Sequence, residues 1–236
     1  MNSKFKFPLL LLLLVFFNCT STKTLRFTKK ADDIVKTSAL KNFLTENKTP
    51  KVVLRVSDAS YVVTEDENVD YLYNAIENQL LKSGFVVRDR QLFNQIIGND
   101  ENNIDYQKLK EKSDTELIIE LIKINPSILY ETNKYYDKNN KEKVEKGAKR
   151  KRFGASIEFK IVMINSNEFA GVYKFNYTPC VEGCVISKSF KDLKKDAKEA
   201  KQKKKEGEVG YEGVEKDILE EFVKNATKQL VEEMRL

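Results

Sequence analysis

Residues 74–96 read NAIENQLLKSGFVVRDRQLFNQI and carry the clearest secondary-structure signals of the chain. The apolar residues of this stretch and those just before it recur at helical spacing, and this pattern predicts a helix that ends where Gly84 provides a cap. Residues 85–88 are apolar and β-branched and predict a strand. Asp89 is a suitable N-cap for a second, shorter helix. The stretch therefore predicts a helix, a strand and a helix in succession, as in an α/β unit.

The sequence on either side supplies the other strands. Residues 51–56 are a short β-branched run, and residues 117–124 are mostly apolar on both faces, as expected of a buried central strand. Two strand-like runs at 153–164 and 169–177 are separated by a short polar link, which predicts an antiparallel hairpin. We therefore expect an α/β (α+β) fold: a single domain with a mixed sheet, an antiparallel hairpin and packed helices.

The remaining segments are predicted as a closing helix and connections. Residues 212–236 place apolar side chains on one helical face, which predicts a docked C-terminal helix. Pro126 is expected to interrupt the central strand, and residues 128–132 are expected to extend the sheet beyond it. Residues 133–152 contain nine basic and three acidic residues and are expected to form a loop. Residues 188–208 are rich in Lys interspersed with acids, which is typical of a solvated helix face.

The first nineteen residues predict export and a lipid anchor. Lys4 and Lys6 precede an unbroken apolar run at 8–17, which is the arrangement of a secretory signal peptide. A helix over this run would be about 15 Å long, half the thickness of a bilayer core, so a permanent span is not expected. Cys19 directly follows the run, and this placement resembles the lipobox of bacterial lipoproteins, whose cysteine is diacylated. An ordinary secretory peptide and an uncleaved anchor are the alternatives.

These signals divide the chain into three predicted parts. Residues 1–18 are a lipoprotein signal peptide, residues 19–49 a polar tether with a weak helix, and residues 50–236 the α/β domain with its C-terminal helix. Cleavage removes two lysines from a chain of net charge +6, which leaves the mature chain only mildly basic. A mild basic excess on an exported chain argues against a nucleic-acid-binding protein.

Cys180 and Cys184 are predicted to form a disulfide. Their C-x3-C spacing, in a loop with Pro179 and Gly183, can bring the two Cα atoms within the roughly 4.4–6.8 Å that a disulfide needs. Export to an oxidising compartment favours the bond. Free thiols and a thiolate metal site are the alternatives, and two cysteines without histidine supply too few ligands for tetrahedral zinc.

The composition argues against most classes of enzyme. The chain contains no His, which excludes Ser-His-Asp and Cys-His catalysis and zinc sites that need imidazole. The sequence also lacks a phosphate-binding glycine motif and a serine nucleophile elbow. We therefore predict a protein that is not an enzyme and that has no cofactor or metal. A hydrolase that uses carboxylates alone is the alternative.

The basic segment at 133–152 supplies the candidate contact residues. Aromatic residues beside cations favour interfaces, and clustered cations attract anionic lipid or an acidic partner. The candidates for such contacts are Tyr135, Tyr136, Lys149, Arg150, Lys151 and Arg152. The alternative is a solvated loop without a partner.

Residues 83–90, SGFVVRDR, resemble a phrase of the CsgG-type family of envelope lipoproteins. This family includes the curli secretion channel subunit and the lipoprotein activators of cell-wall synthases. Residues 115–118 stand in the place of a second family motif, and 159–177 in the place of its hairpin, so the resemblance covers roughly residues 50–178. The chain shows no clear pair of membrane-spanning hairpins, which the channel-forming members need. The resemblance therefore implies a lipid-anchored binding or assembly domain rather than a pore.

Together, these features predict a non-enzymatic cell-envelope lipoprotein at the outer membrane, facing the periplasm or the cell surface. Its expected role is to recruit or assemble envelope proteins, and the resemblance extends this to homo-oligomers. Its expected partners are the membrane and envelope proteins, and nucleic acid is not expected. The alternative function is a surface-exposed lipoprotein that binds host or environmental macromolecules through the basic segment at 133–152.

Overall fold

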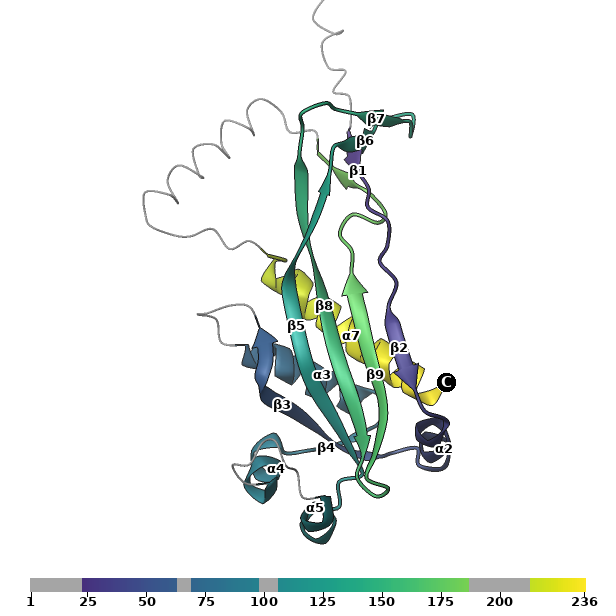
Figure 1. Cartoon of the computed structure of the whole chain (residues 1–236), viewed down its shortest axis with the longest axis vertical. Helices are drawn as coiled ribbons and strands as arrows, with labels where there is room; N and C mark the ends of the chain where they lie inside the picture. Colours follow the sequence, from purple (N-terminus) through teal and green to yellow (C-terminus); the bar gives the residue numbers. More distant parts are fainter. Residues whose placement is uncertain (1–22, 63–68, 98–105, 187–212) are drawn as a thin grey trace, which may run out of the picture. The chain divides into compact units, whose positions relative to one another are not determined.

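The computed structural model describes residues 23–62, 69–97, 106–186 and 213–236 (Figure 1). The chain forms two compact units, and each is described by itself. Unit 1 draws its residues from Met1–Phe27, Glu131–Arg150 and Cys180–Tyr211. Unit 2 comprises Thr28–Tyr130, Lys151–Pro179 and Glu212–Leu236.

Unit 2 is built on a six-stranded mixed sheet with the strand order β2-β9-β8-β5-β3-β4 (Figure 1). β3 pairs in parallel with β4 and β5, whereas β9 pairs antiparallel with β8 and β2. The predicted α+β class, mixed sheet and antiparallel hairpin are therefore confirmed. The strand bounds are β2 Asp33–Lys36, β3 Lys51–Val62, β4 Val86–Arg88, β5 Leu117–Thr132, β8 Arg150–Met163 and β9 Glu168–Tyr177.

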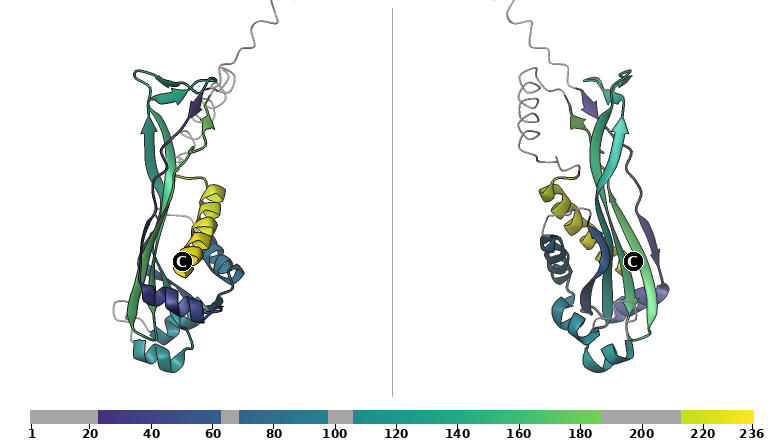
Figure 2. Two further views of the ribbon diagram at one scale, coloured as in Figure 1. Left: turned by 90° about the vertical axis from the view of Figure 1, so that its right-hand side faces the viewer. Right: turned by 60° about the vertical axis from the view of Figure 1, so that its left-hand side comes forward.

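The described residues of unit 2 also form helices that cover its sheet. α3 and α7 pack against each other on one face, and α2 contacts α7 (Figure 2). The predicted N-cap is confirmed, because the Asp89 carboxylate accepts hydrogen bonds from the backbone N–H groups of Gln91 and Leu92 at 2.8 and 2.9 Å. The helix bounds are α2 Ser38–Glu46, α3 Asp70–Lys82, α4 Arg90–Ile97, α5 Tyr106–Lys112 and α7 Lys216–Arg235.

Alternate residues of the central strands enter two different cores. Side chains in a strand point to opposite faces in turn, so consecutive apolar residues face opposite sides of the sheet. Val53 of β3 and Ile118 of β5 belong to a smaller core with Phe93 of α4 and Leu109 of α5. The larger core contains their strand neighbours together with the apolar faces of α3 and α7; from β3 and β5 it takes Val52, Leu54, Leu117, Ile119, Leu121 and Ile124.

β5 runs through Pro126, where the sequence predicted an interruption. β3 pairs with β5 only as far as the Val62–Ile124 pair, so Pro126 lies beyond that ladder. A missing N–H at this position costs no β3–β5 hydrogen bond, and proline is therefore tolerated. The Pro126 carbonyl accepts a hydrogen bond from the N–H of Val214 at 2.9 Å, just before α7.

The structure also corrects the tether prediction for residues 24–36. β1 (Thr24–Leu25) and β2 lie in this range, and the predicted weak helix corresponds to α2. The physical reason is a long-range polar contact that spacing alone does not reveal. One oxygen of the Asp32 carboxylate accepts from the Asn176 N–H at 2.8 Å, and the other accepts from the Gln229 amide at 3.2 Å.

Unit 1 contains a four-stranded antiparallel sheet, and residues 133–152 are not a loop. The strand order is β10-β1-β6-β7, in which β6 is Lys134–Tyr136, β7 is Glu142–Val144 and β10 is Cys184–Val185. The Asp137 carboxylate closes the turn between β6 and β7 by accepting from the backbone N–H groups of Asn139 and Lys141. These hydrogen bonds, that from Lys141 first, hold the pKa of Asp137 below its usual value.

Replacing Tyr173 of β9 by Phe is expected to preserve or raise the stability of unit 2. Tyr173 is 0% exposed, and its hydroxyl has no hydrogen-bond partner among the described residues. Burial first, and the charge of Glu233 second, raise the pKa of Tyr173, so the hydroxyl stays neutral. An unpaired buried hydroxyl costs about 1–3 kcal/mol, so urea denaturation of Tyr173→Phe should show an unchanged or higher free energy of unfolding.

A core truncation provides the control for this measurement. Phe159 packs edge-on against Phe175 with ring centroids 6.5 Å apart. Phe159→Ala should lower the free energy of unfolding by about 3–5 kcal/mol, which shows that the assay detects this core. A loss of more than about 1 kcal/mol in Tyr173→Phe would contradict the expectation and would mean that the hydroxyl is paired.

Candidate functional site

The residues that the sequence predicts as lipidation, disulfide and contact sites lie in different parts of the chain. Cys19 lies outside the described residues. Cys180 and Cys184 are joined by a disulfide in the structure, with their Cα atoms 5.1 Å apart. Gly183 adopts φ +108°, and a Cβ at this position would lie 2.7 Å from the Thr24 side chain, so the small loop packs closely on β1.

Tyr135 and Tyr136 are each contacted by a cation from the same unit. The Lys23 Nζ lies 4.6 Å from the centroid of the Tyr135 ring, and the Arg26 guanidinium lies 5.0 Å from that of Tyr136. Such cation–π contacts contribute about 0.5–1 kcal/mol at exposed sites. The Tyr136 hydroxyl also donates a hydrogen bond to Glu142 at 3.2 Å. The two tyrosines therefore help to hold the sheet of unit 1 together.

The basic run 149–152 is divided between the two units. Lys149 and Arg150 belong to unit 1 and form ion pairs with Glu131 and Glu145, respectively. Lys151 and Arg152 belong to unit 2, where both are exposed at the start of β8. Acidic partners of the same unit thus offset part of the charge that the sequence suggested for binding.

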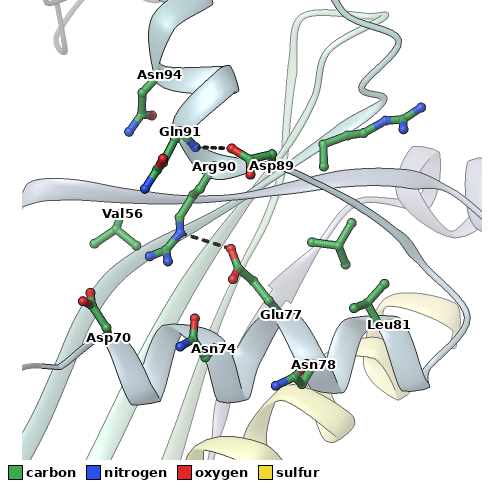
Figure 3. Close-up of a pocket in the computed structure, with 12 residues that line it drawn as sticks. Val56, Asp70, Asn74, Glu77, Asn78, Leu81, Asp89, Arg90, Gln91 and Asn94 are labelled. Atoms are coloured by element: carbon green, nitrogen blue, oxygen red, sulfur yellow. Dashed lines mark hydrogen bonds and ion pairs between the residues drawn. The ribbon is translucent and has the colours of Figure 1, made fainter.

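A further candidate site, which the sequence did not indicate, is a cleft in unit 2. It has a volume of about 790 Å³ and lies at the β4 edge of the sheet, between α3 and the start of α4 (Figure 3). Most of its lining side chains are amides or charged groups, and few are apolar. They are Val56, Asp70, Asn74, Glu77, Asn78, Leu81, Val87, Arg88, Asp89, Arg90, Gln91 and Asn94.

An ion pair spans this cleft. The Nε of Arg90, at the start of α4, donates to a carboxylate oxygen of Glu77 on α3 at 3.1 Å (Figure 3). The guanidinium also lies 5.1 Å from the centroid of the Tyr73 ring. Burial raises the pKa of Glu77, Arg90 opposes this shift, and the nearby Asp89 charge adds to it. Burial likewise raises the pKa of the Tyr73 hydroxyl.

A second cluster of charges lies at the edge of β4. Arg88 and Lys51 both contact the carboxylate of Asp114, at 2.5 and 2.8 Å. The hydrogen bond from Lys51, followed by that from Arg88, lowers the pKa of Asp114. Asp114 is exposed, so water screens this cluster and it contributes little stability.

The arrangement of the cleft suits binding better than bond cleavage. Glu77 is held by Arg90, and Asp89 caps α4, so these two carboxylates already have structural partners. Asn74 and Asn78 lie one turn apart on α3 and line the cleft with amide donors and acceptors (Figure 3). Within the described ranges, no group of three Cys, Asp or Glu side chains could hold a metal ion.

The described helices also bear on how the chain meets a membrane. None of the helices within residues 23–62, 69–97, 106–186 and 213–236 is both long enough and apolar enough to cross a bilayer.

The substitution Glu77→Gln should make the free energy of unfolding depend less on pH. Because the folded-state pKa of Glu77 is raised, the folded state holds this proton more tightly than the unfolded state does. Its contribution to stability is therefore present below the unfolded pKa of about 4.3 and is lost as the pH rises through the folded value. Glu77→Gln should remove this loss, so urea denaturation at pH 7 should show stability equal to or slightly above that of the wild type.

Glu232→Gln is the matched control for the change of charge. Glu232 lies on α7 in an exposed i,i+4 pair with Lys228 at 3.8 Å, and such pairs contribute about 0.3–0.5 kcal/mol. If Glu77→Gln loses more than about 1 kcal/mol at pH 7, the attraction of Arg90 outweighs the burial of Glu77, contrary to our expectation.

No family model and no curated protein matches this chain. Two solved structures of the PelC dodecamer from Paraburkholderia phytofirmans, one of them a single-residue variant, are similar to it at 8% identity. Their TM-scores are 0.40 and 0.41, and the matches cover 87% and 88% of this chain and 96% and 100% of PelC. A neuraminyllactose-binding hemagglutinin homologue from Helicobacter pylori has 13% identity and a TM-score of 0.31, covering 80% of this chain and 82% of its own. All three scores lie below 0.5, so these likenesses do not place the chain in a family, and the CsgG-type resemblance stays a prediction.

Proposed function

We propose that this protein is a lipid-anchored protein of the cell envelope whose unit 2 is a non-enzymatic interaction or assembly domain. The observation that carries the proposal is the N-terminal sequence, in which Lys4 and Lys6, an apolar run at 8–17 and Cys19 occur in the order of a lipoprotein signal. The Cys180–Cys184 disulfide supports export, because such bonds persist in oxidising compartments.

The cleft supports binding as the role of unit 2. Amide side chains both donate and accept hydrogen bonds, and Asn74, Asn78, Gln91 and Asn94 supply four amides around this cleft for contact with a partner. The Arg90–Glu77 pair fixes the two walls relative to each other through one direct contact. We propose envelope proteins as the partners, at the outer membrane, with further copies of this chain among them.

The alternative function depends on residues 133–152 being free to reach a macromolecule. In the structure, much of this segment is taken up by β6 and β7, and Thr24 of β1 pairs with Tyr136. Deleting residues 133–149 would remove both strands and leave β1 without a partner on one side. The segment is therefore part of a folded sheet, so its deletion would disturb folding as well as any binding. The cleft of unit 2 can be probed by changing single side chains, and we therefore keep the interaction domain of unit 2 as the primary proposal.

The lipid anchor is tested by the intact mass and membrane fractionation of the protein expressed in a lipoprotein-processing bacterium. The wild type should yield a mature chain that starts at Cys19, carries the added mass of diacylglycerol and an acyl chain, and sediments with membranes. Cys19→Ala should lose the added mass and the membrane association together. A soluble wild-type chain with an unmodified Cys19 would contradict the proposal.

The interaction role is tested by photo-crosslinking in cells. A photoreactive amino acid at Asn78, on the wall of the cleft, should give a defined adduct with an envelope protein or with another copy of this chain. The same probe at Lys228, on the exposed side of α7, is the control and should not give that adduct. Because only the site of the probe differs, equal adducts at both positions would argue against the cleft as the binding site.

A further inference from the structure

One face of the sheet in unit 1 brings apolar, aromatic and basic side chains together. Thr24 pairs with both Val185 and Tyr136, and Tyr136 pairs with Glu142. Paired residues point to the same face, as do residues two apart in one strand. This surface, called the docking face from here on, therefore carries Thr24, Lys134, Tyr136, Glu142, Val144 and Val185.

The docking face exposes side chains that a sheet in water usually hides. Val144 is 58% exposed and Val185 is 66% exposed, whereas Leu25, the strand neighbour of Thr24, is fully buried. Tyr136 lies between these valines in the strand order, with the Arg26 guanidinium against its ring. Exposed apolar groups with a tyrosine and cations are typical of protein surfaces that lie in the headgroup layer of a membrane.

Positive charge is concentrated in the same unit. The 32 described residues of unit 1 include nine basic and five acidic side chains, against 22 and 19 among the 142 described residues of unit 2. Glu131, Glu142 and Glu145 already form ion pairs with cations of unit 1. Four exposed lysines on or beside the β6–β7 hairpin form no ion pair with another described residue: Lys138, Lys141, Lys143 and Lys146.

The length of chain before β1 limits how far this sheet can lie from a lipid on Cys19. Four peptide units separate Cys19 from Lys23, and a fully extended chain spans at most about 3.6 Å per residue, or about 14 Å here. Neighbouring strands are about 4.8 Å apart, so β6 and β7 lie roughly 5 and 10 Å across the sheet from β1. The tether is therefore short enough to let these lysines reach the surface, and within about 8 Å of it screening leaves a substantial attraction to anionic headgroups.

We propose that the docking face binds the anionic lipid headgroups of the leaflet in which the Cys19 lipid is inserted. The distance limit set by residues 19–23 rests on the proposed lipid anchor. The exposure of Val144 and Val185 and the excess of lysines in unit 1 do not depend on that anchor.

The lipid holds the chain at the membrane, and the docking face determines which side of unit 1 meets the surface. Val144 and Val185 enter the boundary of the headgroup layer, and Lys138, Lys141 and Lys146 contact the phosphates. Lys143 pairs with Tyr135 and points to the other face.

The test is flotation of the unlipidated mature chain, Cys19→Ala, with two kinds of vesicle. Phosphatidylcholine vesicles that contain phosphatidylglycerol should bind the chain, pure phosphatidylcholine vesicles should bind it weakly, and added NaCl should reduce the difference. Lys138→Gln/Lys141→Gln/Lys146→Gln should lower the partition coefficient about 100-fold, since each lysine near such a surface contributes roughly a factor of five. The matched control changes three exposed lysines of unit 2 and should bind nearly as the parent does: Lys29→Gln, Lys41→Gln and Lys123→Gln.

A second pair of variants tests the apolar part of the docking face. Val144→Ser/Val185→Ser should weaken vesicle binding by about threefold or more, because it removes apolar area that enters the boundary layer. Val35→Ser, at a 64% exposed position on β2 of unit 2, should not weaken it. Circular dichroism and urea denaturation of each variant show whether a loss of binding reflects a loss of folding.

The outcomes separate this proposal from the anchor. Equal binding to both kinds of vesicle, or equal losses in the two lysine triples, would overturn the docking face. Binding to polyglutamate as strong as to anionic vesicles, and insensitive to the valine changes, would overturn the lipid in favour of an acidic protein. An unmodified Cys19 in cells, with selective vesicle binding intact, would overturn the proposed anchor and leave the docking face supported.

Discussion

The burial of both faces of β3 and β5 is the constraint on which the rest of unit 2 depends. Val52 and Leu54 need cover on one side of the sheet, and Val53 needs it on the other. Burying one such side chain contributes about 1.5–3 kcal/mol, so neither face can be left open in this region. α3 and α7 cover the first face, and the chain then passes through β4 to bring α4 and α5 to the second. The cleft lies where this crossing occurs, so its position follows from the packing of the two cores.

The sequence predicts those parts of the fold whose signals are local. Gly84 after an amphipathic run and Asp89 before the next one mark a helix end and a helix start, and both act as expected. The predicted interruption of β5 at Pro126 was wrong. Whether a proline breaks a strand depends on the hydrogen bond that its missing N–H would have made, and the pairing of β3 with β5 ends before Pro126. The strands of unit 1 have two or three residues each, too few to show alternation, and their partners are distant in sequence, as with Thr24 and Val185. Pairing of this kind cannot be predicted from hydrophobic spacing.

The candidate site could be predicted only in part, for a related reason. Glu77 and Arg90 both lie within residues 74–96, whose helices the sequence predicts, but a polar face on a helix is usually just solvated. Whether such a face becomes the wall of a cleft depends on what the next element places opposite it. Here the start of α4 places a guanidinium there, and the partial burial that follows raises the pKa of Glu77. The attraction of Arg90 offsets only part of the free-energy cost of burying the Glu77 carboxylate. The ion pair therefore contributes little to the stability of the folded protein, and its main effect is to hold the two walls of the cleft in place.

Different interactions stabilise the interior of each unit, and this difference bears on the roles of the units. Unit 2 has extensive apolar cores, whereas Leu25 is the only buried residue among the described residues of unit 1. Unit 1 depends instead on the Cys180–Cys184 bond, backbone pairing, cation–π contacts and ion pairs, as small folds without a core generally do. Its ion pairs weaken with salt and its disulfide depends on the redox compartment. If this sheet docks on an anionic bilayer as proposed, the lipid surface covers Val144 and Val185 and offsets the surplus positive charge of the unit.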